Sequence, residues 1–235
     1  TKLNLELGGK APAIVLADAN IDLAVEAIKN SRIINTGQVC NCAERVYVQA
    51  SVADEFTSKL SKAMALTRYG DPMAQTDIDM GPLINKMGLD KVAKMVELAK
   101  QQGAEVVTGG KLADLAQGFH YQPTVLSGCN SEMEIMQKEI FGPVLPVQIV
   151  ADLDEAIACA NASEYGLTSS VYTQSLSLAM NAISGLDYGE TYINRENFEA
   201  MQGFHAGARK SGVGGADGKH GLYEYMRTHV AYIQS

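Results

Sequence analysis

The 235-residue chain contains no tryptophan, only four cysteines and four histidines, and no apolar run long enough to form a transmembrane helix. Basic residues are also scarce, since 19 lysines and arginines stand against 27 aspartates and glutamates, giving a net charge of -8. Nucleic-acid binding needs a basic surface. Composition therefore argues against nucleic-acid and membrane partners, and it favours a cytoplasmic protein whose cysteines stay reduced.

The chain also lacks an initiator methionine, a signal peptide and a phosphate-binding glycine loop. Thr1 leads directly into an alternating run over residues 3–7, so we expect the chain to begin inside a fold, as an excised piece would. The glycine-rich run 212–218 follows no predicted strand and has the wrong spacing for a dinucleotide motif, which predicts a turn or hinge. The cysteines and histidines show no zinc-binding spacing, so no metal site is predicted.

Short apolar runs alternate with amphipathic stretches along the chain. Strands are predicted around residues 13–16, 46–48, 105–108, 144–150, 170–173 and 191–194. Helices are predicted around residues 21–28, 52–63, 89–99, 153–162 and 176–183. This alternation predicts an α/β fold with a mostly parallel sheet flanked by helices. Residues 229–235 form a further predicted strand with no nearby partner, suited to extend another sheet edge.

Cys40 ends a small polar run, residues 35–40, in which Gly37 permits a tight backbone turn. A turn or helix start there would aim backbone N–H groups at a developing oxyanion. A thiol attacks a carbonyl carbon, and a carboxylate such as Glu6 activates the water that later releases the product. The alternatives are a small buried side chain for Cys40 and a solvent-facing strand position for Glu6.

The segment 139–143 has two readings. Glu139 would accept hydrogen bonds from a sugar diol and Phe141 would pack against a flat ring, as in a ligand clamp. Alternatively, the segment is a tight turn into the strand that begins near Val144.

Three motifs together, residues 6–10 (ELGGK), 37–40 (GQVC) and 139–143 (EIFGP), resemble the NAD(P)-dependent aldehyde dehydrogenase superfamily in their order and spacing. The resemblance implies that Cys40 is the nucleophile, that its backbone N–H forms part of an oxyanion hole, and that Glu6 activates water. It implies NAD as the cofactor, with NADP as the alternative. The residues it implies for contact with the nicotinamide end of the cofactor are Glu139, Phe141, Leu7 and Gly8.

Residues 41–48 and 189–205 resemble the branch of that superfamily that oxidises lactaldehyde and glycolaldehyde. Asn41 follows the nucleophile, and Glu199 and His205 lie in a long loop that, by resemblance, borders the substrate entrance. These three polar side chains suit a small 2-hydroxyaldehyde, because a site built to pair a hydroxyl group rejects apolar analogues. A solvated loop is the alternative.

Members of that superfamily are about twice as long, so the resemblance also implies a division of the chain. Residues 1–8 would lead in from a cofactor domain that the chain lacks, residues 9–220 would form the catalytic domain, and residues 221–235 would form a C-terminal tail for oligomerisation. We therefore expect a homo-oligomer that binds dinucleotide weakly and does not oxidise aldehydes as an isolated chain. Two other functions stay open, namely a cofactor-free thiol hydrolase and a non-catalytic domain that only self-associates.

Overall fold

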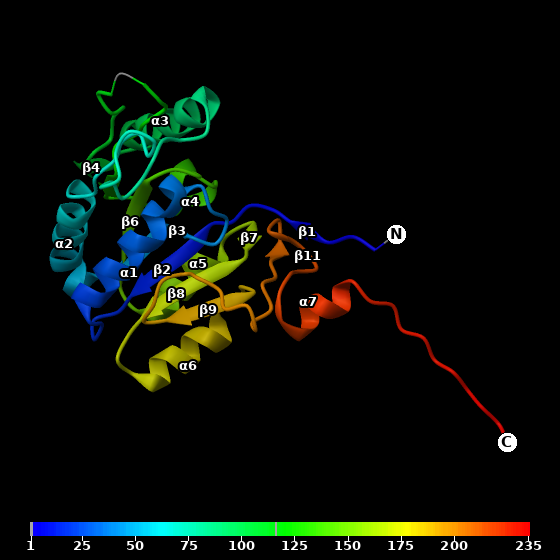
Figure 1. Ribbon diagram of the computed structural model, residues 1–235. Helices are drawn as coiled ribbons and strands as arrows, with labels where there is room; N and C mark the ends of the chain where they lie inside the picture. The colour runs from blue at the N-terminus through cyan, green and yellow to red at the C-terminus, as the bar shows by residue number, and fades with distance from the viewer. Residues whose placement is uncertain (1, 116) are drawn as a thin grey trace.

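A seven-stranded sheet forms the centre of the computed structural model, which describes residues 2–115 and 117–235 (Figure 1). The strand order is β4-β5-β6-β3-β2-β8-β9. Neighbouring strands run parallel except β4 and β5, which are antiparallel. The predicted α/β class and mostly parallel sheet are confirmed. The strands are β2 (Ala11–Val15), β3 (Ala43–Gln49), β4 (Glu105–Thr108), β5 (Thr124–Ser127), β6 (Val144–Val150), β8 (Thr168–Tyr172) and β9 (Glu190–Ile193).

Two helical layers cover the sheet, because successive side chains of a buried strand point to opposite faces. On β2, Ala13 and Val15 belong to the core beneath α1 (Ile21–Ile33) and α2 (Ala53–Ala65), whereas Ile14 belongs to the core of the opposite layer. That opposite layer contains α3 (Lys86–Gln101), α4 (Glu134–Gln137), α5 (Leu153–Asn161) and α6 (Leu176–Gly185).

Helix starts are fixed by side-chain caps. Asn20 accepts a hydrogen bond from the Leu23 amide at the start of α1, and Asn85, Asp152 and Ser175 do the same for α3, α5 and α6. Such caps satisfy amide groups that have no partner within the helix. They help to explain why these four helices begin close to the positions that the sequence predicts, whereas α2 begins without a side-chain cap.

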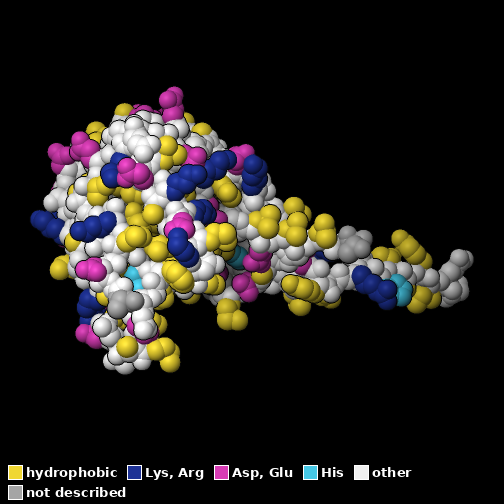
Figure 2. Space-filling model, turned by 90° about the horizontal axis from the view of Figure 1, so that it is seen from above, with side chains coloured by type: hydrophobic (Ala, Val, Ile, Leu, Met, Phe, Trp, Pro, Cys, Tyr) yellow, Lys and Arg dark blue, Asp and Glu magenta, His cyan; other side chains and the backbone are white. Residues whose placement is uncertain are grey.

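Small elements lie outside the sheet. β1 (Leu5–Glu6) pairs with β11 (Gly212–Val213), and β7 (Tyr165–Gly166) pairs with β10 (Ala208–Arg209). The helix α7 (Gly218–Glu224) follows, and two 3₁₀ turns, η1 (Ile34–Gly37) and η2 (Ala50–Val52), flank β3. Both chain ends project from the same side of the molecule (Figure 1), and Figure 2 shows hydrophobic side chains exposed along this projection.

Three local predictions differ from the structure. The buried strand β5 was not predicted, and the alternating run at residues 3–7 forms only the two-residue strand β1. The glycine-rich run 212–218 contains β11 as well as a turn. Residues 229–235 form no strand in the single chain and are exposed, so their pairing stays a prediction.

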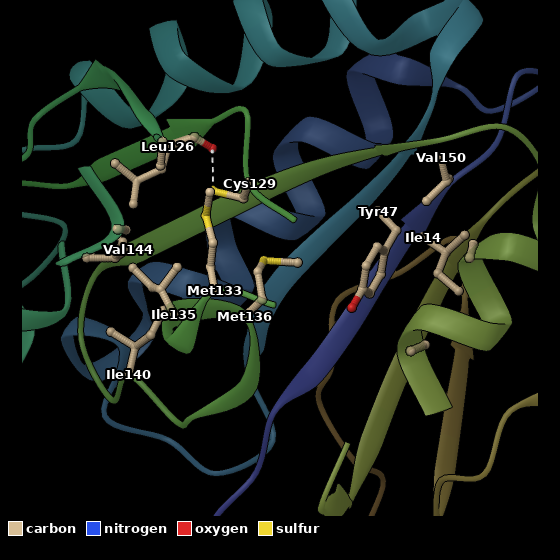
Figure 3. Packing of buried hydrophobic residues seen from close by; sticks show 14 of the residues in the cluster. Ile14, Tyr47, Leu126, Cys129, Met133, Ile135, Met136, Ile140, Val144 and Val150 are labelled. Atoms are coloured by element: carbon tan, nitrogen blue, oxygen red, sulfur yellow. Dashed lines mark hydrogen bonds between the residues drawn. The ribbon is translucent and has the colours of Figure 1, made fainter. Parts of the chain in front are cut away.

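The larger hydrophobic core cluster includes buried residues from the segment that precedes β6. Figure 3 shows Met133 and Met136 between the group of Ile135, Ile140 and Val144 on one side and Tyr47 of β3 on the other. Ile140 anchors the segment 139–143 in this hydrophobic core. Within the described ranges, no helix combines the length and the hydropathy that a membrane span requires.

Candidate active site

The predicted motifs meet at the amino-terminal edge of the parallel strands. Gly9 and Lys10 precede β2, Cys40 precedes β3, Glu139 precedes β6 and Glu190 begins β9. Because β2, β3, β6, β8 and β9 run parallel to one another, these positions fall on one edge of the sheet. Ligands of open α/β sheets commonly bind at the opposite edge, at the carboxyl ends of the strands. This site is therefore identified by the contacts between its loops and not by its position on the sheet.

The chain reaches Cys40 through a run of left-handed backbone. Asn35, Thr36 and Gly37 have φ values of 45°, 61° and 76°. This conformation is uncommon for a non-glycine residue and costly for the β-branched Thr36. The buried Thr36 hydroxyl donates to the carbonyl of Gly81 at 2.9 Å, and a Cβ atom on Gly37 would overlap the carbonyl of Gly142. The predicted tight turn at Gly37 is therefore present, and it is held from two sides.

The four cysteines differ in their exposure to solvent. The Cys40 side chain is half-buried, as is Cys159, whereas Cys42 and Cys129 are buried. Burial raises the pKa of both the Cys42 and the Cys129 thiols to about 11, which suppresses their nucleophilic thiolate form. Cys42 and Cys129 thus behave as core side chains, while Cys40 lies on a loop with a route to solvent.

The glycine pair joins the Cys40 loop to Glu139. A Cβ atom on Gly9 would overlap the backbone carbonyl oxygen of Cys40. The Gly9 amide donates to Glu139 Oε1 at 2.7 Å. A Cβ atom on Gly8 would lie 2.9 Å from Glu139 Oε2, so the absence of a side chain there keeps a space open beside the carboxylate. Burial raises the pKa of Glu139, which remains half-buried.

A buried ion network, which the sequence analysis missed, supports this segment. Glu44 accepts from Lys10 Nζ at 2.8 Å and from Arg32 Nη1 at 2.8 Å, and all three side chains are at most 1 % exposed. The same carboxylate accepts from the amides of Ile140 at 2.8 Å and Phe141 at 3.0 Å. Burial lowers the pKa of Lys10 to about 8, while Lys10 and Arg32 hold the pKa of Glu44 below its usual value despite its burial. Glu44 thereby fixes the backbone next to Glu139.

Arg45 is a second buried cation in β3. Its guanidinium donates to the carbonyls of Lys10 and Ala160 at 3.1 and 2.8 Å and to the hydroxyl groups of Tyr47 and Tyr188 at 2.9 and 2.8 Å. The available sequence signal was a pair of adjacent charges inside an otherwise apolar strand, because such charges are rarely buried without partners.

The three predicted substrate residues lie around the nucleophile loop. The Asn41 amide donates to the Glu199 carboxylate, and the carbonyl of Asn41 accepts from Thr168 Oγ1 at 2.7 Å. The His205 ring places Nδ1 2.5 Å from Glu190 Oε1. Hydrogen bonding to Cys40 and Glu190 raises the pKa of His205 to about 10. A pocket of about 290 Å³ opens beside them, lined in part by Glu190, Tyr192, Glu199 and Phe204.

Three further residues of the predicted site are exposed to solvent, namely Glu6, Leu7 and Phe141. Glu6 is exposed on β1, and its carboxylate makes no hydrogen bond or ion pair with any residue the structure describes. It lies three residues before Gly9, which limits the chain path between them to about 10 Å. Leu7 and Phe141 are 51 % and 37 % exposed, and Phe141 has a left-handed φ of 57°. The structure thus interlocks Gly8, Gly9, Cys40 and Glu139.

Among the described residues, no group of three histidine, cysteine, aspartate or glutamate side chains is arranged to hold a metal ion.

The chain resembles known proteins over almost its whole length. The sequence model of the aldehyde dehydrogenase family matches residues 1–231. Lactaldehyde dehydrogenase from Escherichia coli is 60 % identical over the whole chain, which covers 49 % of that protein. The 3,6-anhydro-alpha-L-galactose dehydrogenase of Streptomyces coelicolor is 44 % identical, with 99 % of this chain and 48 % of that protein covered. The D-glyceraldehyde dehydrogenase (NADP(+)) of Picrophilus torridus is 38 % identical, with 99 % of this chain and 47 % of that protein covered.

A crystal structure of the Escherichia coli lactaldehyde dehydrogenase superimposes with a TM-score of 0.98, covering 100 % of this chain and 49 % of the other. The chain thus spans about half the length of the curated relatives it matches.

Proposed function

The chain belongs to the aldehyde dehydrogenase family, and we propose that it supplies the nucleophile and the water-activating base for the NAD-dependent oxidation of small 2-hydroxyaldehydes to carboxylic acids. Lactaldehyde and glycolaldehyde are the proposed substrates. The observation that carries the proposal is the interlocking of the Cys40 loop, the glycine pair and the Glu139 segment at one edge of the sheet.

Cys40 begins the reaction. Its thiolate sulfur attacks the aldehyde carbon, and the carbonyl oxygen becomes the alkoxide of a thiohemiacetal. The backbone N–H of Cys40 is proposed to donate to that oxygen, which stabilises the developing charge. Loss of hydride then leaves a thioester on Cys40. Glu6 takes a proton from water as the water attacks the thioester carbon, which releases the acid and returns the thiolate.

The residues around Glu139 fit a nicotinamide dinucleotide. The second carboxylate oxygen of Glu139 faces the open space at Gly8, where a ribose hydroxyl could donate to it, and Phe141 presents a half-exposed ring at the same turn. When bound, the dinucleotide supplies the hydride acceptor. Leu7 and Gly8 are proposed to border its nicotinamide end. NAD is the proposed cofactor with NADP as the alternative, and two relatives carry NADP(+) in their names.

Asn41, Glu199 and His205 are proposed to recognise the substrate hydroxyl. The hydrogen bond from Asn41, the residue after Cys40, to the Glu199 carboxylate supports this role, as does the pocket that Glu199 and Glu190, the partner of His205, help to line. A site whose polar groups pair with a hydroxyl loses much of its binding when the hydroxyl is missing, because the groups are then left unpaired. Relatives named for lactaldehyde and D-glyceraldehyde are compatible with the proposed substrate class.

The catalytic roles can be tested by measuring aldehyde oxidation with two proteins in parallel. One is the 235-residue chain, and the other is the longest natural polypeptide that contains residues 1–235. We expect Cys40→Ala to abolish lactaldehyde oxidation, and Glu6→Gln to let a thioester accumulate at Cys40, visible as added mass on the protein. The matched control is Cys159→Ala, the other half-buried thiol. Full activity of Cys40→Ala would refute the proposal.

We propose that the 235-residue chain alone is inactive, and aldehyde-dependent NADH production by it would refute that point.

Substrate recognition is tested by the ratio of kcat/KM for lactaldehyde to that for propanal. We expect Glu199→Ala and His205→Ala each to lower this ratio by roughly tenfold or more, since each leaves the substrate hydroxyl short of a partner. Glu196→Ala, on the same loop and ion-paired only with its neighbour Arg195, is the control. An unchanged ratio in both variants would contradict the assigned roles.

The half-buried Cys40 thiol also favours a second activity, the cofactor-free hydrolysis of activated esters. In that case 4-nitrophenyl acetate is hydrolysed without dinucleotide, and Cys40→Ala removes the hydrolysis. If neither reaction depends on Cys40 in a natively folded protein, the domain is non-catalytic and only its self-association remains to be explained.

A further inference from the structure

Asn197 is a buried polar residue in a loop that is otherwise open to solvent. It follows β9 and is the one buried residue of the segment 194–200. Asn197 is 3 % exposed, whereas its neighbour Phe198 is 53 % exposed. Buried polar side chains in proteins are almost always hydrogen-bonded, so the partners of Asn197 indicate its role.

Asn197 bonds one side chain from each of two other elements. Its Nδ2 donates to Thr168 Oγ1 of β8 at 3.2 Å, and its Oδ1 accepts from Ser31 Oγ of α1 at 3.2 Å. Thr168 and Ser31 are buried as well, so all three side chains are shielded from water. Both polar atoms of the Asn197 amide are therefore paired inside the protein.

The two outer members of this set, Thr168 and Ser31, hold the backbone that follows the nucleophile. The Thr168 hydroxyl donates to the carbonyl of Asn41 at 2.7 Å, and the Ser31 hydroxyl accepts from the amide of Ala43 at 2.9 Å. The four hydrogen bonds run in one direction, from the Ala43 amide to the Asn41 carbonyl, because each hydroxyl group accepts one bond and donates the next. Hydrogen bonds linked in this way polarise and strengthen one another in a low-dielectric interior.

The loop that carries Asn197 also contacts the side chain of Asn41. The Asn41 side-chain amide donates to the carboxylate of Glu199, two residues beyond Asn197. Glu199 in turn lines the pocket of about 290 Å³ beside the nucleophile segment. One loop thus holds the backbone of Asn41 through Asn197 and its side chain through Glu199.

We propose that Thr168 and Asn197 are positioning residues for substrate selectivity, because they fix the Asn41 backbone so that its side chain stays paired with Glu199 beside the pocket. The inference rests on the proposed function, in which Asn41 and Glu199 recognise the substrate hydroxyl. Thr168 and Asn197 act through Asn41 and do not touch the substrate. Hydrogen bonds weaken steeply with misalignment, so a shift of the Asn41 backbone lowers the recognition of a hydroxyaldehyde. An aldehyde without that hydroxyl does not use the pair and is little affected.

The first test measures the ratio of kcat/KM for lactaldehyde to that for propanal in the longest natural polypeptide that contains residues 1–235. We expect Thr168→Val, which replaces the hydroxyl by a methyl group, to lower this ratio by roughly tenfold. Thr168→Ser keeps the hydroxyl and should keep the ratio. Thr124→Val in β5 is the matched control, because the buried Thr124 hydroxyl also accepts one hydrogen bond and donates another.

The second test needs neither aldehyde nor dinucleotide. It measures amide hydrogen exchange at Ala43 by NMR, relative to the Tyr47 amide further along β3, which reports on the opening of the sheet. We expect Thr168→Val to speed exchange at Ala43 by about fivefold, as for the loss of one hydrogen bond, although Thr168 bonds Ala43 only through Asn197 and Ser31. Thr124→Val should leave the relative rate unchanged.

An unchanged substrate ratio in folded Thr168→Val overturns the proposal, and so does exchange at Ala43 that does not respond. If Thr168→Val does not fold, Ser31→Ala breaks the same set of hydrogen bonds at its other end, and its substrate ratio gives the decision. Failure of the proposed function looks different, because Cys40→Ala then keeps aldehyde oxidation or the wild type shows no preference for lactaldehyde. Here the wild type prefers lactaldehyde, and only the response of the variants is at stake.

Discussion

Glu44 shows how a single buried side chain can support a site that it does not enter. Its carboxylate is the shared counter-ion of Lys10 and Arg32 and the acceptor for two amides of the Glu139 segment. A buried ion pair adds little net stability by itself, but removing one partner leaves an uncompensated charge in the interior. The consequence of losing Glu44 should thus be global as well as local.

We predict that Glu44→Gln lowers the free energy of unfolding by about 3–5 kcal/mol, because Lys10 and Arg32 would be left buried without a counter-charge. Urea denaturation followed by circular dichroism measures the change. Glu97→Gln is the control, since Glu97 is exposed and pairs only with Lys100 on the helix surface and should change stability little. A loss below about 1 kcal/mol for Glu44→Gln would contradict the role assigned to the network.

His205 predicts a specific pH dependence of stability. Its pKa is raised from 6.5 to about 10 by its hydrogen bonds to Cys40 and Glu190. A raised pKa in the folded state stabilises that state fully below about pH 6.5, and this contribution is lost as the pH rises through about 10. Lys10, whose pKa is lowered to about 8, has the opposite slope above that pH.

We therefore expect the difference in unfolding free energy between wild type and His205→Asn to be largest near pH 6 and to shrink steadily toward pH 10. Lys10 is present in both proteins, so its contribution cancels in the difference. Thermal or urea unfolding at several pH values measures the effect. A difference that stays constant between pH 6 and pH 10 would show that the ring does not titrate with the raised pKa.

The sequence motifs correctly indicated the family, and they predict Cys40 as the nucleophile, but they could not place the Glu6 carboxylate. Alternation predicts only that Glu6 faces away from Leu3, Leu5 and Leu7, and in the structure that whole segment is exposed. The Glu44 network was missed for a different reason. Its three members are separated by up to 34 residues, and only tertiary packing shows that their charges are buried together.

At the scale of elements, the site depends on loops that lock together without side chains. Gly9 packs against the Cys40 carbonyl and Gly37 against the Gly142 carbonyl, so adjacent loops approach more closely than any Cβ atom permits. Neither contact could be derived from local propensity, because each joins segments whose separation in the sequence is long. The sequence indicated only that the glycines would permit some close approach.

We predict that Gly9→Ala destabilises the protein and slows Cys40 alkylation, because the added methyl group would displace the Cys40 backbone. Overpacking of this kind costs roughly 1–3 kcal/mol. The matched control is Gly88→Ala in the first turn of α3, where an added Cβ meets nothing closer than 3.6 Å and alanine favours the helix. Equal effects of the two substitutions on stability and on alkylation would argue against the interlocked loops.

The predicted helices and strands match the structure where hydrophobic residues recur at regular spacing, and for helices also where a capping residue marks the start. The five long helices follow their apolar spacing, and α1 begins at the Asn20 cap. The strand β5 was missed because its run is short, Thr124–Ser127, and lies between Pro123 and Gly128, where turn residues dominate the pattern. Its place between β4 and β6 depends on pairing partners distant in the sequence.

At the scale of the whole molecule, the two chain ends form a projecting arm whose apolar side chains have no cover in the single chain. β1 and α7 lie at its base, and Tyr232 and Ile233 are 95 % and 93 % exposed near its tip. Figure 2 shows hydrophobic side chains along this arm. Extended segments rich in β-branched and aromatic residues readily add to a sheet edge of another chain.

We predict that the chain self-associates through residues 229–235, and that Tyr232→Asp combined with Ile233→Asp shifts it toward the monomer. Two charges on the pairing segment would have to be buried in the interface, which costs more than the backbone hydrogen bonds of a short strand contribute. Light scattering coupled to size-exclusion chromatography measures the mass over a range of concentrations. Arg227→Gln is the control, because it changes the charge of the same arm outside the pairing segment. If the double aspartate variant keeps the wild-type mass, association runs through another surface, and the tail is a free end.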